Sequence, residues 1–133
     1  MSDKSLWGDL SELAPERTPF LLLQEQANYL QGATNEILEG RAQRQMSTVG
    51  KKVNATLDVV APALQRYYIA ILGLTYDASM LYPVDVEDFL SGVVRAASSE
   101  DELKKLLREI LTSDDVRTIL ANLIAESQFS QRV

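Results

Sequence analysis

The chain has 133 residues, 46% of them hydrophobic, and a formal net charge of −6, which fits a single acidic domain with its own core. It contains no cysteine and no histidine, which excludes disulfides, thiolate metal sites, cysteine nucleophiles and histidine-based acid–base or zinc chemistry. The acidic balance also argues against binding along a nucleic-acid backbone, which needs clustered lysine and arginine.

Residues 1–17 are expected to form a flexible N-terminal arm. Its large apolar residues recur at roughly helical spacing: Leu6, Trp7, Leu10 and Leu13. Gly8 and Pro15 limit the length of any helix there. The arm is either a loosely packed terminus or a contact in which Trp7 anchors on a partner subunit or on the domain itself. The arm has no apolar core of signal-peptide length, and no apolar run in the chain approaches the ~20 residues of a membrane helix. We therefore expect a cytoplasmic protein without membrane contact.

A helix is predicted to begin at Thr18 and Pro19 and to continue to Gly40. Threonine can cap a helix, and proline is tolerated at the first helical position. Apolar residues then recur every three or four positions. Gly32 costs up to about 1 kcal/mol relative to alanine inside a helix, and it is expected to let a neighbouring element approach closely. Gly40 is predicted to stop the helix.

The stretch from residue 40 to residue 52 carries four bases and no acid. It is predicted to form a polar edge strand, followed by a turn at Val49 and Gly50, because charged side chains on an edge strand discourage aggregation. The alternative is a site for an anion or an acidic partner. With Trp7, the four bases are the candidate partner-binding residues: Arg41, Arg44, Lys51 and Lys52.

The middle of the chain is predicted to form the centre of an antiparallel sheet. Residues 53–60 alternate between apolar and polar side chains, which is typical of a half-buried strand, and Pro62 interrupts them. Residues 67–76 are apolar on both sides, so we expect this strand to be covered on both faces. Residues 80–84 form a last short strand, which Pro83 confines to an edge or an end.

Three later windows match the i, i+3, i+4, i+7, i+8 pattern of an amphipathic helix: residues 86–94, 103–111 and 116–124. A capping-box pattern precedes the second window, and acids open the third. The predicted fold class is therefore α+β, with an N-terminal helix, a three- to four-stranded antiparallel meander sheet and three C-terminal helices packed on the sheet. The single domain is expected to span residues 18–127, followed by a tail at residues 128–133.

Carboxylates are the main candidates for chemistry in a chain without histidine and cysteine. Asp85, Glu87 and Asp88 form the densest group and could bind Mg²⁺ or Ca²⁺, although acids in the first turn of a helix need no further reason. Asp58 and Asp77 come from neighbouring strands and could pair for acid–base work, but solvated side chains are the expected state. No cofactor and no metal site are predicted.

The predicted function is protein–protein contact, in a small acidic adaptor or chaperone-like protein of bacterial type that forms a homodimer or binds another protein. Charge is separated along the chain, because residues 40–52 carry +4 while residues 85–115 carry nine acids and four bases, or −5, and separated charge favours self-association or a charged partner. Two alternatives stay open. One is a small-ligand module with a tyrosine-lined pocket that includes Arg44 or Arg66. The other is a divalent-metal-dependent enzyme that uses the three carboxylates at positions 85, 87 and 88.

Overall fold

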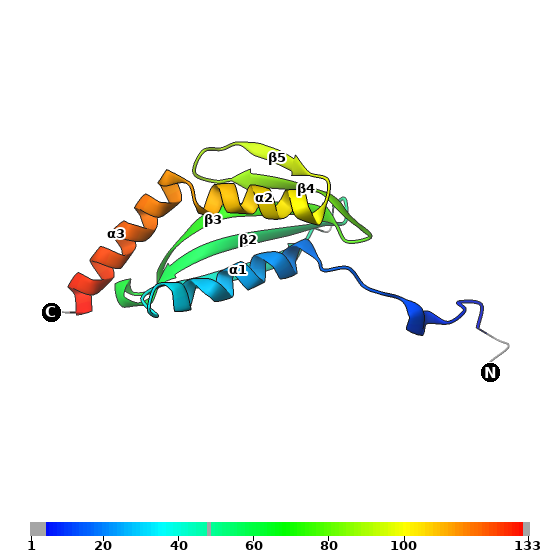
Figure 1. Ribbon diagram of the computed structural model, residues 1–133, viewed down its shortest axis with the longest axis horizontal. Helices are drawn as coiled ribbons and strands as arrows, with labels where there is room; N and C mark the ends of the chain where they lie inside the picture. Colours follow the sequence, from blue (N-terminus) through cyan, green and yellow to red (C-terminus); the bar gives the residue numbers. More distant parts are fainter. Residues whose placement is uncertain (1–4, 48, 132–133) are drawn as a thin grey trace.

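The computed structural model describes residues 5–47 and 49–131. Its elements are, in chain order, η1 (Leu10–Glu12), α1 (Pro19–Ala33), β1 (Glu39–Met46), β2 (Lys52–Ala61), η2 (Pro62–Leu64), β3 (Tyr67–Asp77), β4 (Met80–Asp88), β5 (Val94–Ala97), α2 (Glu100–Leu111) and α3 (Asp114–Gln131) (Figure 1). The strands form one antiparallel meander sheet in the order β1-β2-β3-β4-β5. One helix precedes the sheet and two follow it, which confirms the α+β class.

The sheet has five strands rather than three or four, and two C-terminal helices follow it rather than three. Residues 86–94, predicted as a helix, form the end of β4, a tight turn and the start of β5. Gly92 has a φ of +78°, and the Asp88 carboxylate accepts the backbone N–H of Leu90 at 2.9 Å, both of which are typical of turns. The helix-like spacing comes from two valine-containing strands on either side of this turn, and β-branched valine favours the strand conformation.

The other helices begin where the sequence predicts. The Thr18 hydroxyl accepts the N–H of Leu21 at 3.1 Å, and the Ser99 hydroxyl accepts the N–H of Glu102 at 3.2 Å. The predicted windows 103–111 and 116–124 lie within α2 and α3. The N-terminal helix, however, ends at Ala33, so Gly40 is not its stop.

Gly40 lies in β1, and it is the residue that allows two elements to approach closely. A Cβ atom built on Gly40 would lie 2.3 Å from the carbonyl oxygen of Ala27 in α1. Around Gly32, where the sequence suggested a close approach, an added Cβ would meet nothing within 4 Å. The backbone of α1 is therefore seated directly on β1 at Gly40, at one edge of the sheet.

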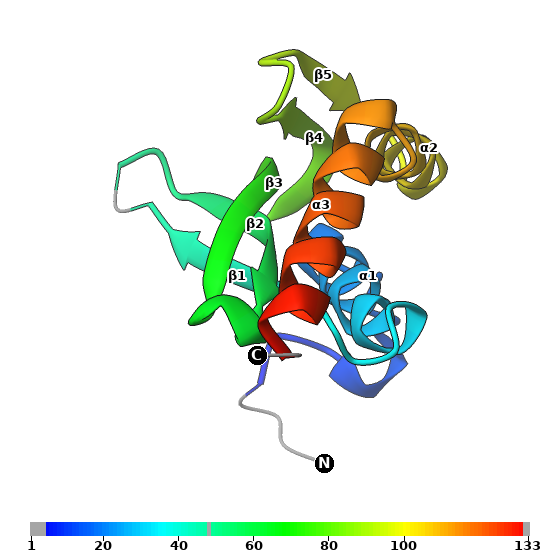
Figure 2. The same ribbon diagram turned by 90° about the vertical axis from the view of Figure 1, so that its left-hand side faces the viewer.

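All three helices cover the same face of the sheet (Figure 2). The core between the two layers is formed by buried side chains of the strands and helices, among them Leu23, Leu38, Val53, Ala55, Leu57, Leu72, Leu74, Val84, Val86, Leu103, Leu107 and Val116. The N-terminal helix α1 lies on the same side as α2 and α3 and does not cover the second face of β3. No helix of the described residues covers the other face.

A β-bulge explains why β3 is apolar on both sides. Leu57 of β2 pairs with Leu72, whereas Val59 pairs with Ile69, so Ile71 is an extra residue on β3. An extra residue shifts the alternation of side chains by one position. In β3, odd-numbered residues therefore face the helices before the bulge, and even-numbered residues face them after it. The bulge alone explains why apolar residues occur at both odd and even positions, without a second covered face.

β4 is longer than the predicted last strand and lies between β3 and β5. Pro83 lies opposite a register irregularity between Thr75 and Asp77, a position that tolerates a residue without an N–H. Among the residues that the structure describes, no helix is long and apolar enough to cross a membrane.

Candidate functional site

An apolar cleft of about 180 Å³ opens between α1 and α3, and the sheet forms its floor. The floor is made by Leu57 and Val59 of β2 and by Ile71, the bulge residue of β3. The walls include Ala27, Leu30 and Ala33 of α1 and Val116 and Leu120 of α3. The cleft thus leaves apolar surface of the core uncovered between two helices.

The cleft continues along α1 into a wider depression of about 380 Å³ between α1 and α2. The two hollows share Gln26, Tyr29 and Leu111 in their linings. The two hollows therefore adjoin along α1, and we call them together the helix groove. Its end near α3 is apolar, and its end near α2 is lined by long charged side chains.

The charged end of the helix groove is basic. Arg17, Lys104 and Arg108 line it together with one acid, Glu25, which gives three positive charges against one negative charge, or +2. Arg17 pairs with Glu25, and Lys104 pairs with Glu100 at 3.1 Å. Arg108 has no ion pair within the described part of the chain. A groove of this sign stands out on a chain whose net charge is −6.

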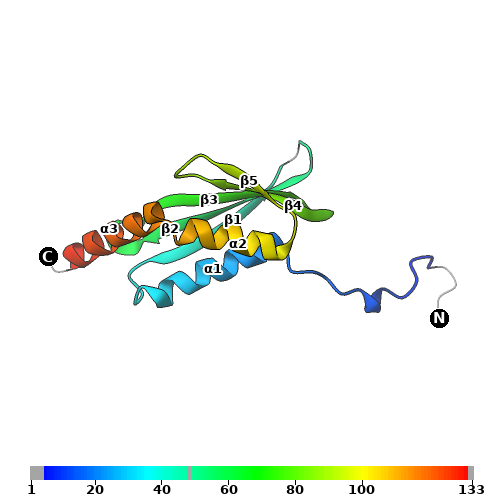
Figure 3. The ribbon, with the colours of Figure 1, turned by 45° about the horizontal axis from the view of Figure 1, so that its top comes forward.

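The structure does not bring the predicted partner-binding residues into one site. Arg44 faces the helices, and its guanidinium carbon lies 5.2 Å from the centre of the Phe20 ring. Lys51 and Lys52 are exposed at the hairpin between β1 and β2. Trp7 is 80% exposed and belongs to the arm, which extends beyond the start of α1 (Figure 3). A role of these residues in partner binding stays a prediction.

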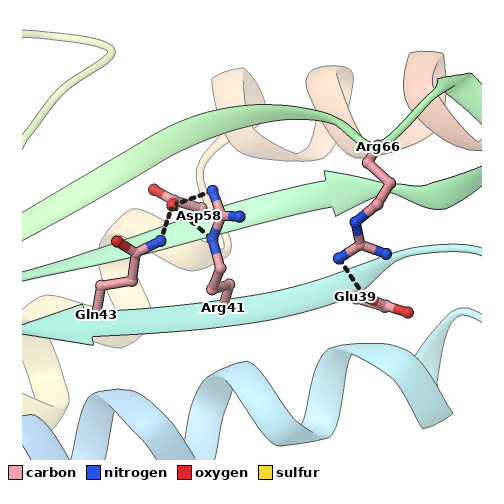
Figure 4. Close-up of polar contacts among 5 residues, drawn as sticks. All are labelled: Glu39, Arg41, Gln43, Asp58 and Arg66. Carbon is pink, nitrogen blue, oxygen red and sulfur yellow. Dashed lines mark hydrogen bonds and ion pairs between the residues drawn. The ribbon is translucent and has the colours of Figure 1, made fainter.

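Arg41 belongs to an ion pair on the face of the sheet that has no helix. Its Nε and Nη2 atoms donate to Oδ2 of Asp58 at 3.1 and 2.9 Å, and Gln43 donates to the same oxygen at 3.4 Å (Figure 4). The guanidinium also lies 4.4 Å from the centre of the Tyr68 ring. Asp58 is only 4% exposed, so the expectation of a solvated Asp58 is wrong. Because the register places Arg41 directly opposite it, the two charges neutralise each other.

Neither Arg44 nor Arg66 lines the helix groove. Arg66 pairs with Glu39 of β1 at 3.4 Å (Figure 4). Tyr67, beside it, is exposed at the start of β3. The tyrosine that does line the helix groove is Tyr29 of α1, which the sequence analysis did not single out.

Asp58 and Asp77 do not converge. Asp77 lies opposite Lys52, at the far end of the β2–β3 ladder from Asp58. Its carboxylate accepts the hydroxyl and the backbone N–H of Ser79 at 2.7 and 2.8 Å, and these hydrogen bonds lower the pKa of Asp77. Acid–base work by this pair is therefore not supported by the geometry.

The acidic group at positions 85–88 lies in β4 and not in the first turn of a helix. Asp85 and Glu87 are exposed and alternate along the strand, whereas the Asp88 carboxylate is occupied by the N–H groups of Leu90 and Ser91 at 2.9 and 3.3 Å. Within residues 5–47 and 49–131, no group of three or more acidic, histidine or cysteine side chains could hold a metal ion.

The basic residues of the helix groove were missed at the sequence level. Lys104 and Arg108 are four residues apart in α2 and therefore share one helix face, which is the signal that the sequence carries. Arg17 lies more than eighty positions earlier, just before α1. Only the packing of α1 beside α2 brings the three bases together.

Comparisons with known proteins give no relative, because no family model, no curated protein and no solved structure matches the chain. The function is therefore argued from the geometry and charge of the helix groove.

Proposed function

We propose that this protein is a non-catalytic adaptor or chaperone-like protein, and that its helix groove binds an amphipathic, acidic segment of a protein partner. The observation that carries this proposal is that an apolar cleft and a basic depression adjoin along α1, where they share Gln26, Tyr29 and Leu111. Amphipathic helices commonly bind by laying their apolar face into a hydrophobic groove between helices. A segment with apolar residues on one side and acids on the other matches both ends of this groove.

The size of the apolar cleft favours side-chain anchors over a whole small molecule. Pockets for small ligands usually measure about 300–1,000 Å³ and enclose most of the ligand. The apolar cleft holds about 180 Å³, which is less than that range, and four of the ten residues that line the adjoining depression carry long charged side chains. One or two apolar side chains of a protein segment can fill the cleft while the rest of the segment lies along α1.

The charge of the groove sets its preference between acidic and basic segments. The side chains of Arg17 and Lys104 are nearly half exposed, so each ionic contact is worth only about 0.2–1 kcal/mol. Reversing two such charges replaces two attractions with two repulsions. Since 1.4 kcal/mol corresponds to a tenfold change in affinity, we expect a loss of about tenfold or more.

The test uses two fluorescent peptides with the same leucine stripe at i, i+3, i+4 and i+7, one with glutamates and one with lysines on the polar face. Fluorescence anisotropy with the full chain is expected to show tighter binding of the glutamate peptide, weakened by added salt. Two variants should each weaken that binding: the double change Lys104→Glu/Arg108→Glu at the basic end, and Ala33→Glu at the apolar wall. Both act on exposed positions, and circular dichroism checks that folding is retained.

Lys51→Glu is the matched control, because it reverses an exposed base at the β1–β2 hairpin, away from the groove. It should leave peptide affinity unchanged. Loss of binding in Lys51→Glu but not in the groove variants would refute the proposal and move the site to the predicted basic stretch. Equal affinity for both peptides would also refute it. Displacement of the peptide by a simple acidic amphiphile such as dodecanoate would favour the small-ligand alternative.

A further inference from the structure

The N-terminal arm, residues 5–17, has the chemistry that the helix groove requires. Leu6 and Trp7 are 96% and 80% exposed, and Leu10 and Leu13 are also exposed. Large apolar side chains gathered in this way on a surface mark an interaction site. We propose that the arm of one chain occupies the helix groove of a second copy, so that two chains exchange their arms. This inference rests on the proposed function of the groove and names its partner.

The arm complements the groove in charge as well as in apolarity. Arg17, at the root of the arm, lines the groove of its own chain. The part of the arm that can be exchanged is therefore residues 5–16, which contain three acids, Asp9, Glu12 and Glu16, and no base, giving −3 against the +2 of the groove lining. The apolar residues at positions 6, 10 and 13 recur at helical spacing. Asp9 already caps the short helix η1 by accepting the N–H of Ser11 at 3.0 Å. The apolar stripe matches the cleft, and the acids match Lys104 and Arg108.

The backbone directs the arm away from the groove of its own chain. Ala14 precedes Pro15 and Thr18 precedes Pro19, and a residue before proline is held in an extended conformation. Leu13 and Thr18 have ψ angles of 133° and 153°, as expected for extended chain. The arm accordingly extends from the start of α1 away from the helices and the sheet (Figures 1 and 3). The groove lies along α1 on the other side of this point, so the arm would have to turn back to reach the groove of its own chain. A second copy can receive the arm without a reversal of the chain.

Arm exchange between two copies gives a closed dimer. Each chain donates one arm and offers one groove, so two identical contacts form about a twofold axis and no arm or groove remains unused. A second consequence concerns the proposed function: an external acidic segment has to compete with the arm. A partner segment therefore binds only if its affinity for the groove exceeds that of the arm.

Trp7 gives a direct readout, because it is the only tryptophan of the chain. Sedimentation equilibrium of the full chain is expected to show a monomer–dimer transition, and the Trp7 emission should shift to shorter wavelength as the dimer forms. Trp7→Ser and Ala33→Glu should each shift the dimer dissociation constant upward by at least about tenfold. Ala125→Glu adds the same charge at an exposed position of α3 outside the groove and should behave as the unchanged chain. Thermal unfolding of each variant verifies folding.

Mixing the two variants separates exchange from binding within one chain. The Trp7→Ser chain has an intact groove but no tryptophan, and the Ala33→Glu chain has an intact arm. Arm exchange predicts that adding Trp7→Ser shifts the emission of Ala33→Glu to shorter wavelength and forms a mixed dimer. A blue-shifted emission that does not depend on concentration or mixing would place the arm in its own groove and overturn the inference. A monomer with exposed Trp7 at all concentrations would also overturn it, and the proposed function would still stand if the acidic peptide bound. If neither the peptide nor the arm binds the groove, both the proposed function and the arm exchange are refuted.

Discussion

The seating of α1 on β1 can be tested by making the same substitution at two glycines, Gly40→Ala and Gly32→Ala. The structure predicts opposite effects on stability. A Cβ atom at position 40 would lie 2.3 Å from the carbonyl oxygen and 2.6 Å from the Cα atom of Ala27. At position 32, in the same helix as Ala27, an added Cβ would meet nothing within 4 Å. The pair therefore separates the close approach from the general effect of replacing glycine.

The magnitudes follow from which atoms must move. The atoms facing Gly40 belong to the backbone of α1, so no change of rotamer can relieve the clash. Because carbon atoms pack best at about 3.5–4.0 Å, α1 and β1 would have to separate by roughly 1 Å, which loosens Leu23 and Ala27 in the core. Overpacking of this kind costs about 1–3 kcal/mol, and we expect the upper end. Gly32→Ala should instead raise the free energy of unfolding by up to about 1 kcal/mol, because alanine favours the helix.

Urea denaturation followed by circular dichroism measures both variants against the unchanged chain. We expect their free energies of unfolding to differ by about 3–4 kcal/mol, with similar m-values. A Gly40→Ala chain as stable as the original would refute the backbone contact between α1 and β1. It would also remove the argument for the groove, because that contact fixes the α1 wall at the edge of the sheet.

Three further substitutions test other parts of the structure. Arg41→Met should lower the free energy of unfolding in urea by about 2–3 kcal/mol, because it leaves the buried Asp58 carboxylate without its ion-pair partner; the 36% exposure of the arginine side chain reduces this cost. Adding Asp58→Leu should recover most of the lost stability, and no recovery would contradict the ion pair. Tyr82→Phe should leave stability at neutral pH unchanged or raise it by about 1 kcal/mol, because the Tyr82 hydroxyl is buried and has no hydrogen-bond partner among the residues that the structure describes. Burial raises the pKa of Tyr82 in the folded chain, so the contribution of its protonated hydroxyl to folding stability is complete below about pH 10 and is lost as the pH rises above the unfolded pKa. The melting temperature of the Phe variant should therefore fall less at alkaline pH than that of the unchanged chain, and equal falls would contradict this. Ile71→Asp should abolish the cooperative unfolding transition, because it places an unpaired charge in the core, and a folded variant would disprove the central position of β3.

Sequence patterns predicted elements well where local chemistry decides them. Thr18 and Ser99 cap the helices that were expected to follow them, and the basic stretch forms a polar edge strand. These features depend on a few neighbouring residues, so no knowledge of the fold is needed. The two helices at the end of the chain were found for the same reason, since each carries a clear stripe of apolar residues.

Sequence patterns gave the wrong element where the same spacing of apolar residues fits both a helix and a pair of strands. Residues 86–94 match a helical stripe and also match two strand ends around a turn, and the turn is decided by Asp88 and Gly92. In β3, the apolar residues on both sides suggested two covered faces, whereas the bulge at Ile71 changes which side faces the helices. An extra residue in one strand depends on the partner strand, which a single segment does not reveal.

Charge along the sequence was a poor guide to charge in space, and this difference explains why we propose the helix groove and not the basic stretch as the site. The stretch with four bases and no acid looked like the basic site, but the fold pairs Arg41 with Asp58 and places Arg44 over an aromatic ring. Segments without such a run supply Arg17, Lys104 and Arg108, which the packing of α1 beside α2 brings to one groove. The same fold leaves an acidic, apolar arm exposed before the start of α1. Because attraction between proteins depends on where charges face solvent, we propose the helix groove, and not the basic stretch, as the surface that binds an acidic partner.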